Sequence, residues 1–111
     1  MSRGLSGFRA WLWQRATAAY IGLFTLYLVW HFLAAPPADV AALRAWLGGP
    51  AVWTGVAILG LALLLHAWIG LRDVLLDYVK PPRLRVALLG LVLLYLLANG
   101  LWLARVLLEV G

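Results

Sequence analysis

The sequence predicts an all-α integral membrane protein with three transmembrane helices, forming a single membrane-anchor domain over residues 1–111. Hydrophobic residues make up 66% of the chain and charged residues only 12%, too few charges to cover the surface of a soluble domain of this length. A helix needs roughly 20 apolar residues to cross the hydrocarbon of a bilayer. Three segments without Asp, Glu, Lys or Arg meet this need, with 23, 27 and 19 residues between Arg15 and Asp39, Arg44 and Arg72, and Arg85 and Arg105.

The first of these segments predicts a transmembrane helix over residues 13–35, which Pro36 and Pro37 end. Proline lacks the backbone N–H that a helix interior needs and disfavours the helical conformation in the residue before it. A cleaved signal peptide does not describe the segment well, because it is too long and shows no small-residue cleavage site.

The linker over residues 36–50 has the composition of one or two turns of interfacial helix, with Trp46 at the level of the lipid headgroups. A second transmembrane helix is predicted over residues 51–75. The segment 77–85 is predicted to break the helix at Pro81 and Pro82. The third transmembrane helix is then predicted over residues 84–108.

The distribution of basic residues predicts the orientation of the chain. Seven of the nine Lys and Arg residues lie at the N-terminal end of the first helix or around the connection between the second and the third, leaving Arg44 and Arg105 for the other side. Because cytoplasmic loops carry the excess of Lys and Arg, we expect a cytoplasmic N-terminus. The net charge of +5 therefore has a topological explanation, and we expect lipid and other subunits as partners, with no nucleic acid. The absence of cysteine excludes thiolate and iron–sulfur ligation within the chain.

His66 is the most informative residue, because it lies about two turns inside the second predicted helix. Polar residues at that depth are costly and often functional, and an imidazole there can bind a haem iron axially. Ala62 and Gly70 share its helical face and would let a flat macrocycle approach. Alternatively, His66 makes an interhelical hydrogen bond and the small residues serve helix packing. His31 lies near the opposite membrane face, so we do not expect the two histidines to share one haem.

Three further groups at the predicted cytoplasmic side are candidates for function. Arg15 can bind haem propionates with its guanidinium, or it contacts lipid phosphate and sets topology. Tyr78 can donate a hydrogen bond to a quinone carbonyl and Asp77 can take part in proton delivery, or both are ordinary residues of a membrane boundary. Arg72 and Asp73 either mark that boundary or pair with a docked soluble protein.

The block HAWIGLRDVLLDYVKP, residues 66–81, resembles the family of the smaller hydrophobic membrane anchor of bacterial succinate dehydrogenase, the cytochrome b556 small anchor. The run Arg-Ala-Thr-Ala at residues 15–18 and the three-helix layout are similar to the same family. The resemblance implies an anchor in the bacterial inner membrane that works with a second hydrophobic anchor, an iron–sulfur subunit and a flavoprotein. Electrons from succinate would pass through FAD and iron–sulfur clusters on those partners to ubiquinone, with one b-type haem between the two anchors.

The resemblance also implies roles for individual residues. His66 matches the axial haem ligand of this anchor, with the opposing histidine on the partner anchor, and Arg15 matches an arginine near the haem propionates. Tyr78 matches the tyrosine that hydrogen-bonds ubiquinone, with Asp77 beside it. His31 has no counterpart in the family pattern, and the charges of Arg72 and Asp73 depart from it.

Two other functions remain open from the sequence. One is the anchor of a fumarate reductase or of another quinone-linked dehydrogenase. The other is a cofactor-free small membrane protein, such as a transporter protomer or an assembly factor. A transporter is expected to have a charged residue near the bilayer midplane, and none of the three predicted segments contains one. We do not expect the chain to oxidise succinate by itself, since it has no nucleotide-binding pattern and no cysteine.

Overall fold

A computed structural model describes residues 3–111, with side chains from residue 7 onward. The chain folds into four α-helices: α1 (Arg3–Ala34), α2 (Val40–Leu47), α3 (Pro50–Tyr78) and α4 (Pro82–Val110). No β-strand occurs in the described range. Helices α1, α3 and α4 are each long and apolar enough to cross a membrane. The predicted all-α fold with three membrane-spanning helices is therefore confirmed.

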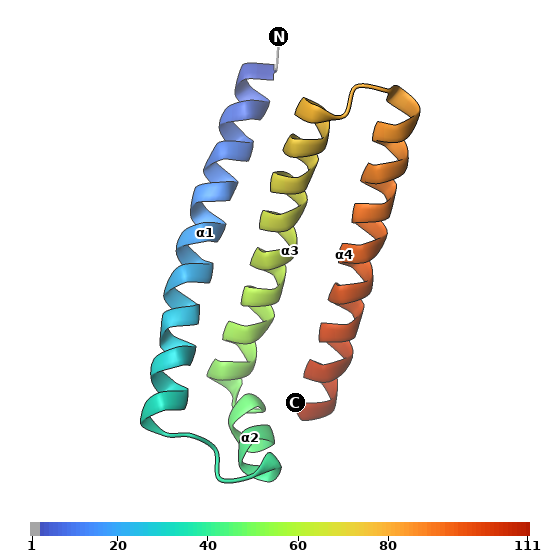
Figure 1. Ribbon diagram of the computed structural model, residues 1–111. Helices are drawn as coiled ribbons and strands as arrows, with labels where there is room; N and C mark the ends of the chain where they lie inside the picture. The colour runs from blue at the N-terminus through green and yellow to red at the C-terminus, as the bar shows by residue number, and fades with distance from the viewer. Residues whose placement is uncertain (1–2) are drawn as a thin grey trace.

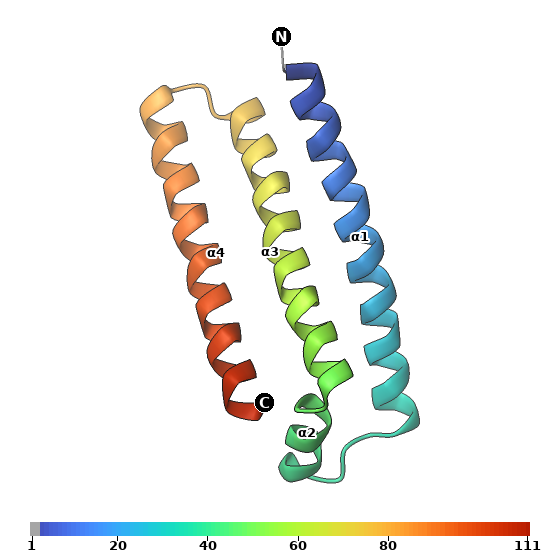
Figure 2. The ribbon, with the colours of Figure 1, turned by 180° about the vertical axis from the view of Figure 1, so that it is seen from behind.

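The three long helices form an open row (Figure 1). Helix α3 lies in the middle and contacts α1 on one side and α4 on the other, whereas α1 and α4 make no contact within the described residues. The molecule is accordingly elongated, with extents of 52 × 25 × 21 Å. The view from behind shows the N-terminal end of α1 at the same end of the row as the α3–α4 connection, and the C-terminus beside α2 at the opposite end (Figure 2). The two segments rich in Lys and Arg thus lie at the same end of the row.

Two helix boundaries differ from the sequence prediction. Helix α1 begins at Arg3 rather than near residue 13, because Arg9 and Arg15 limit a membrane span but do not prevent a helix from continuing into water. Helix α3 continues through Tyr78, beyond the end predicted near residue 75. The break is short because Pro81 is the N-cap residue of α4 and Pro82 its first helical residue, a position at which the missing N–H would have no partner anyway.

The predicted interfacial turns in the linker form α2. The Asp39 side chain begins this helix by accepting a hydrogen bond from the Ala42 backbone N–H at 2.8 Å, which satisfies one of the free donors of a helix N-terminus. Trp46 stacks on His31 of α1, with ring centroids 4.3 Å apart. This contact connects α2 to the far end of α1.

The chain has almost no core of its own. Among the side chains that the structure describes, the buried hydrophobic residues are Ala62, Ile69 and Leu107, whereas Leu33 and Leu108 are 80% and 75% exposed. Exposed apolar surface on this scale is typical of lipid-facing or partner-facing surface. An open row of apolar helices therefore presents two broad faces to lipid or to other subunits.

Close packing and hydrogen bonds connect neighbouring helices, as expected where lipid removes the hydrophobic driving force between them. The Tyr20 hydroxyl of α1 donates to the Gly55 carbonyl of α3 at 2.7 Å. The Phe24 ring lies against the same glycine, so close that an added Cβ would be 2.6 Å from its Cε1. On the other side of α3, Trp53 Nε1 donates to the Leu107 carbonyl of α4 at 2.7 Å.

Candidate functional site

His66 of α3 faces α1 and is joined to it by a hydrogen bond. Its Nδ1 lies 2.9 Å from the hydroxyl oxygen of Thr17, which is the buried polar side chain of the described range at 6% exposure. The other ring nitrogen, Nε2, has no hydrogen-bond partner among the described residues. One side of the imidazole is thus fixed to α1 and the other remains available.

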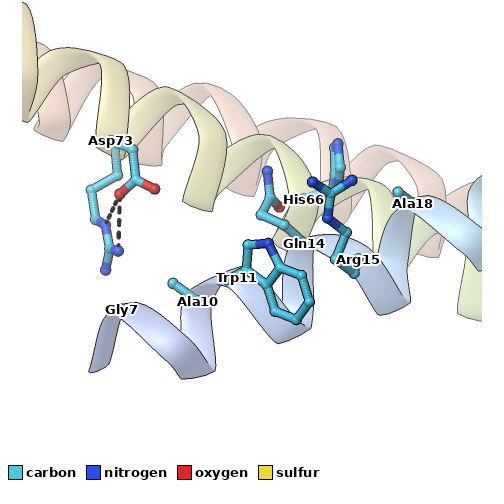
Figure 3. A pocket seen from close by; sticks show the side chains of 9 residues that line it. Gly7, Ala10, Trp11, Gln14, Arg15, Ala18, His66 and Asp73 are labelled. Carbon is cyan, nitrogen blue, oxygen red and sulfur yellow. Dashed lines mark hydrogen bonds and ion pairs between the residues drawn. The ribbon is translucent and has the colours of Figure 1, made fainter. Parts of the chain in front are cut away.

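A pocket of about 430 Å³ opens beside His66, between α1 and α3. Figure 3 shows Arg15 and His66 toward one end of this pocket and Asp73, which pairs with Arg72, toward the other. On the α1 side the pocket is lined in part by Gly7, Ala10 and Ala18, whose small side chains leave space between the two helices. The structure therefore brings together Arg15 and His66, two of the residues singled out from the sequence, although 51 positions separate them.

Arg15 places a positive charge on the wall of this pocket. Its guanidinium carbon lies 5.5 Å from the centroid of the Trp11 ring, within the range of a cation–π contact. It forms no ion pair with a described residue. The adjacent Gln14 also lines the pocket, and its buried side-chain oxygen has no hydrogen-bond partner in the described part of the chain. The pocket wall thus offers an unpaired cation and an unsatisfied polar atom.

The small residues on either side of His66 pack against α1. Ala62 is buried, and a Cβ added to Gly70 would lie 3.4 Å from Gln14 Nε2. These contacts agree with the interpretation in which the small residues allow close approach of two helices. The space beside His66 comes instead from the small residues of α1.

Arg72 and Asp73 pair with each other. The guanidinium Nη2 lies 3.1 Å from Asp73 Oδ1, and both residues line the pocket. Each keeps a substantial exposed fraction, 38% for Arg72 and 50% for Asp73, so the pair contributes little to stability. It forms a polar rim at the end of the pocket nearest the α3–α4 connection.

Tyr78 and Asp77 lie outside the pocket, in the last turn of α3. Tyr78 is 79% exposed and is separated from His66 by about 18 Å along the helix axis. Asp77 lies within about 20° of His66 around the helix, on the face that packs on α1, whereas Tyr78 is rotated by about 120°. The structure therefore does not bring Tyr78 and His66 into one site.

His31 belongs to an aromatic cluster at the other end of the row. It stacks on Trp46 and meets Phe32 edge to face, with ring centroids 5.6 Å apart. Thr17, which contacts His66, precedes His31 by 14 residues on the same helix, equivalent to about 21 Å. The two histidines of the chain are therefore too far apart to bind one metal centre, as expected from the sequence.

Three residues at or near the site, Thr17, Gln14 and Arg85, make contacts that no pattern in the sequence reveals. Thr17 lies within the Arg-Ala-Thr-Ala run, and its hydrogen bond with the half-buried His66 is visible only once α1 and α3 are paired. Gln14 was overlooked for the same reason. Arg85 had been counted as a topology charge, yet it donates to the Val79 and Leu76 carbonyls at 3.0 and 3.1 Å. These carbonyls end α3 and would otherwise lack partners.

No group of three or more His, Cys, Asp or Glu side chains within the described range is arranged to hold a metal ion.

Comparison with known proteins assigns the chain to a family. Residues 5–100 match the family described as succinate dehydrogenase/fumarate reductase transmembrane subunit. The chain is 31% identical over 96 residues to the succinate dehydrogenase hydrophobic membrane anchor subunit of Coxiella burnetii, an alignment that covers 86% of this chain and 84% of that relative. The chain belongs to the succinate dehydrogenase/fumarate reductase transmembrane subunit family and is a membrane anchor of that kind.

Proposed function

We propose that this chain is the smaller hydrophobic anchor of a succinate dehydrogenase in the inner membrane of a bacterium. Its partners are then a second hydrophobic anchor, an iron–sulfur subunit and a flavoprotein. Two observations support this: the similarity to a succinate dehydrogenase anchor over most of both chains, and the open row of α1, α3 and α4. A row with two apolar faces is incomplete as a bundle, which suits a second membrane subunit packed against it.

A b-type haem between the two anchors is the second part of the proposal, with His66 as the axial ligand from this chain. The pocket lined by His66 and Arg15 is the observation that supports it most directly. The donor chemistry fits the group. One imidazole nitrogen is engaged by Thr17 and the other is without a partner among the described residues. Arg15 supplies a guanidinium that can pair with a propionate.

When bound, the haem supplies one-electron redox chemistry between the iron–sulfur subunit and the quinone. The residues of this chain then have distinct tasks. His66 would hold the iron together with a histidine of the partner anchor. Arg15 would bind an anionic propionate through its guanidinium. The apolar helices around the pocket exclude water, and this lowers the local dielectric.

Ubiquinone reduction is the third part, with Tyr78 and Asp77 contributing to the quinone site. Tyr78 is 79% exposed at the end of α3, so its hydroxyl is free to meet a ligand or partner. A phenol can donate a hydrogen bond to a quinone carbonyl, and a nearby carboxylate at the aqueous edge can pass a proton. Because Tyr78 is distant from the His66 pocket, the quinone site is separate from the haem site within this chain.

The proposed orientation has the N-terminus and the α3–α4 connection in the cytoplasm. Both lie at the end of the row with most of the basic residues, as expected for the cytoplasmic side. The iron–sulfur subunit then binds at the end where Tyr78 and the pocket rim lie. The FAD and iron–sulfur clusters held by the partners would supply the electrons from succinate, and Tyr78 would bind the ubiquinone that accepts them.

A second candidate function is the anchor of a fumarate reductase or of another quinone-linked dehydrogenase, which the breadth of the matched family favours. A cofactor-free small membrane protein is the third, and it conflicts with an unpaired arginine and an available imidazole nitrogen in one pocket. The first two candidates require a flavoprotein and an iron–sulfur protein as soluble partners, whereas the third does not.

Copurification tests the proposed function. A tagged copy of the chain, extracted in mild detergent from its native membrane, should bring a flavoprotein, an iron–sulfur protein and a second hydrophobic anchor in equal amounts. The isolated complex should reduce ubiquinone with succinate. Isolation as a homodimer without these partners would overturn the proposal, and faster fumarate reduction than succinate oxidation would favour the second candidate.

A further inference from the structure

The Thr17 hydroxyl is positioned to fix the protonation pattern of the His66 ring. Its oxygen has three polar neighbours: the Trp13 carbonyl at 2.6 Å, the Gln14 carbonyl at 3.2 Å and His66 Nδ1 at 2.9 Å. A hydroxyl has a single hydrogen to donate and two lone pairs with which to accept. The positions of hydrogens therefore follow from which neighbours can donate.

The two carbonyls can only accept a hydrogen bond, and the Trp13 carbonyl is the nearest of the three neighbours. Threonine in a helix commonly donates to the carbonyl four residues back. If the hydroxyl hydrogen pointed to His66 instead, two carbonyl oxygens would face the threonine oxygen at close range with no hydrogen between them. The hydrogen is therefore directed to Trp13, and Thr17 accepts from His66.

We infer that Thr17 is a positioning residue that holds His66 as the tautomer protonated at Nδ1, with the lone pair of Nε2 free to bind a haem iron. This inference rests on the proposed haem ligation by His66 and adds to it the residue that prepares the ligand. A metal-binding histidine commonly donates its second N–H to an oxygen nearby, which fixes the ring and raises its basicity. Here that oxygen comes from a neighbouring helix, so the ligand is aligned by the packing of α1 on α3.

Burial strengthens the effect of this contact. Thr17 is 6% exposed, and in a site of low dielectric a hydrogen bond is stronger than in water. Trp13 and Thr17 both lie in α1, so the hydrogen bond to the Trp13 carbonyl holds the Thr17 hydroxyl oxygen, which accepts from His66, in a fixed position. A neutral hydroxyl also polarises the N–H less than a carboxylate does, which leaves the ligand a neutral imidazole.

Four variants of the complete complex, purified with its partner subunits, test the inference. Thr17→Val has nearly the shape of threonine without the hydroxyl, and Thr17→Ala has neither the hydroxyl nor its volume. Thr17→Ser keeps the hydroxyl and differs from Thr17→Ala in that group alone. Thr25→Val makes the same chemical change at an exposed position of α1 that does not contact His66.

The measurements are haem content per FAD, the midpoint potential of the haem and the low-spin signal of the oxidised haem in electron paramagnetic resonance. Without the hydroxyl acceptor, His66 becomes a less basic ligand and stabilises ferric iron less. Thr17→Val and Thr17→Ala should therefore both shift the midpoint potential of the haem upward. Both should also retain haem about tenfold less strongly. Thr17→Ser and Thr25→Val should match the wild type.

A purely structural role of Thr17 gives a different pattern, with Thr17→Val like the wild type and Thr17→Ala impaired through lost volume. That pattern, or an unchanged potential in both variants, would overturn the inference while leaving haem ligation by His66 intact. If only Thr17→Val assembles, its comparison with the wild type tests the role of the hydroxyl. If only Thr17→Ala assembles, its comparison with Thr17→Ser does so. A wild-type complex without haem would instead contradict the proposed function.

Discussion

The guanidinium of Arg85, in the first turn of α4, donates to the carbonyls of Leu76 and Val79 at the end of α3. The side chain thus links the start of α4 to the end of α3 across the connection that contains the two prolines. Tyr78 lies between these two acceptors in the sequence. The position of the proposed quinone residue therefore depends on an arginine that is outside the resembling block of residues 66–81.

Replacing Arg85 by methionine should loosen the end of α3. Two hydrogen bonds to backbone carbonyls are lost at a partly exposed site, which corresponds to about 1 kcal/mol of local stability. Hydrogen exchange of the amides around Tyr78 should become about fivefold faster in the purified complex. Arg83→Met is the matched control, because Arg83 lies on the same turn and makes no hydrogen bond with a described residue. Equal exchange in both variants would contradict this role for Arg85.

Replacing Tyr78 by phenylalanine should slow ubiquinone reduction about tenfold, the effect of one lost hydrogen bond to the quinone. Electron transfer from succinate to a water-soluble artificial acceptor should be unchanged, since that reaction bypasses the quinone. Tyr95→Phe, at an exposed tyrosine in the middle of α4, serves as the control. An equal loss with both acceptors would show that Tyr78 affects assembly rather than quinone binding.

Replacing Arg15 by glutamine should weaken haem retention. A charge-assisted hydrogen bond to a propionate is lost, so dissociation of haem from the complex should be favoured about tenfold. Arg15→Lys should be intermediate, because lysine keeps the charge but lacks the planar fork. Haem content after prolonged washing measures the effect. Arg9→Gln, on the same helix outside the pocket, should retain haem like the wild type.

Replacing Gly55 by alanine should destabilise the contact of α1 with α3. The added methyl group would meet the Phe24 ring at 2.6 Å, and overpacking of this kind typically costs about 1–3 kcal/mol. The melting temperature of the complex should fall. At Gly90 of α4 an added Cβ meets nothing within 4 Å, so Gly90→Ala should leave the melting temperature unchanged or raise it through better helix propensity. A similar response of both variants would argue against close packing at Gly55.

The existence and number of the membrane helices could be predicted from the sequence, because the charge-free segments are long and the prolines mark their ends. The boundaries could not. Arg9 and Arg15 limit a membrane span without limiting a helix, and Pro81 and Pro82 fit at the start of α4 without ending α3 early. Asn99 is a polar residue inside α4, and its Nδ2 donates to the Tyr95 carbonyl of its own helix rather than to a neighbouring helix.

Of the candidate site, the sequence identified His66 and Arg15 but not their surroundings. That these two residues share a pocket depends on the alignment of α1 with α3, which the close approach of Phe24 to Gly55 and the Tyr20 hydrogen bond determine. The role of Thr17 depends on the same alignment. Contacts of this kind depend on helix rotation and axial shift, which hydropathy and residue spacing do not specify.

Haem ligation by His66 is the central claim, and an absorption spectrum of the purified complex tests it most directly. Reduction with succinate should give the sharp bands of a six-coordinate b-type haem in the wild type. His66→Ala should lose these bands or replace them with those of a five-coordinate haem, while His31→Ala should keep them, because His31 lies in the aromatic cluster at the other end of α1. An unaltered six-coordinate spectrum in the His66→Ala complex would contradict the account.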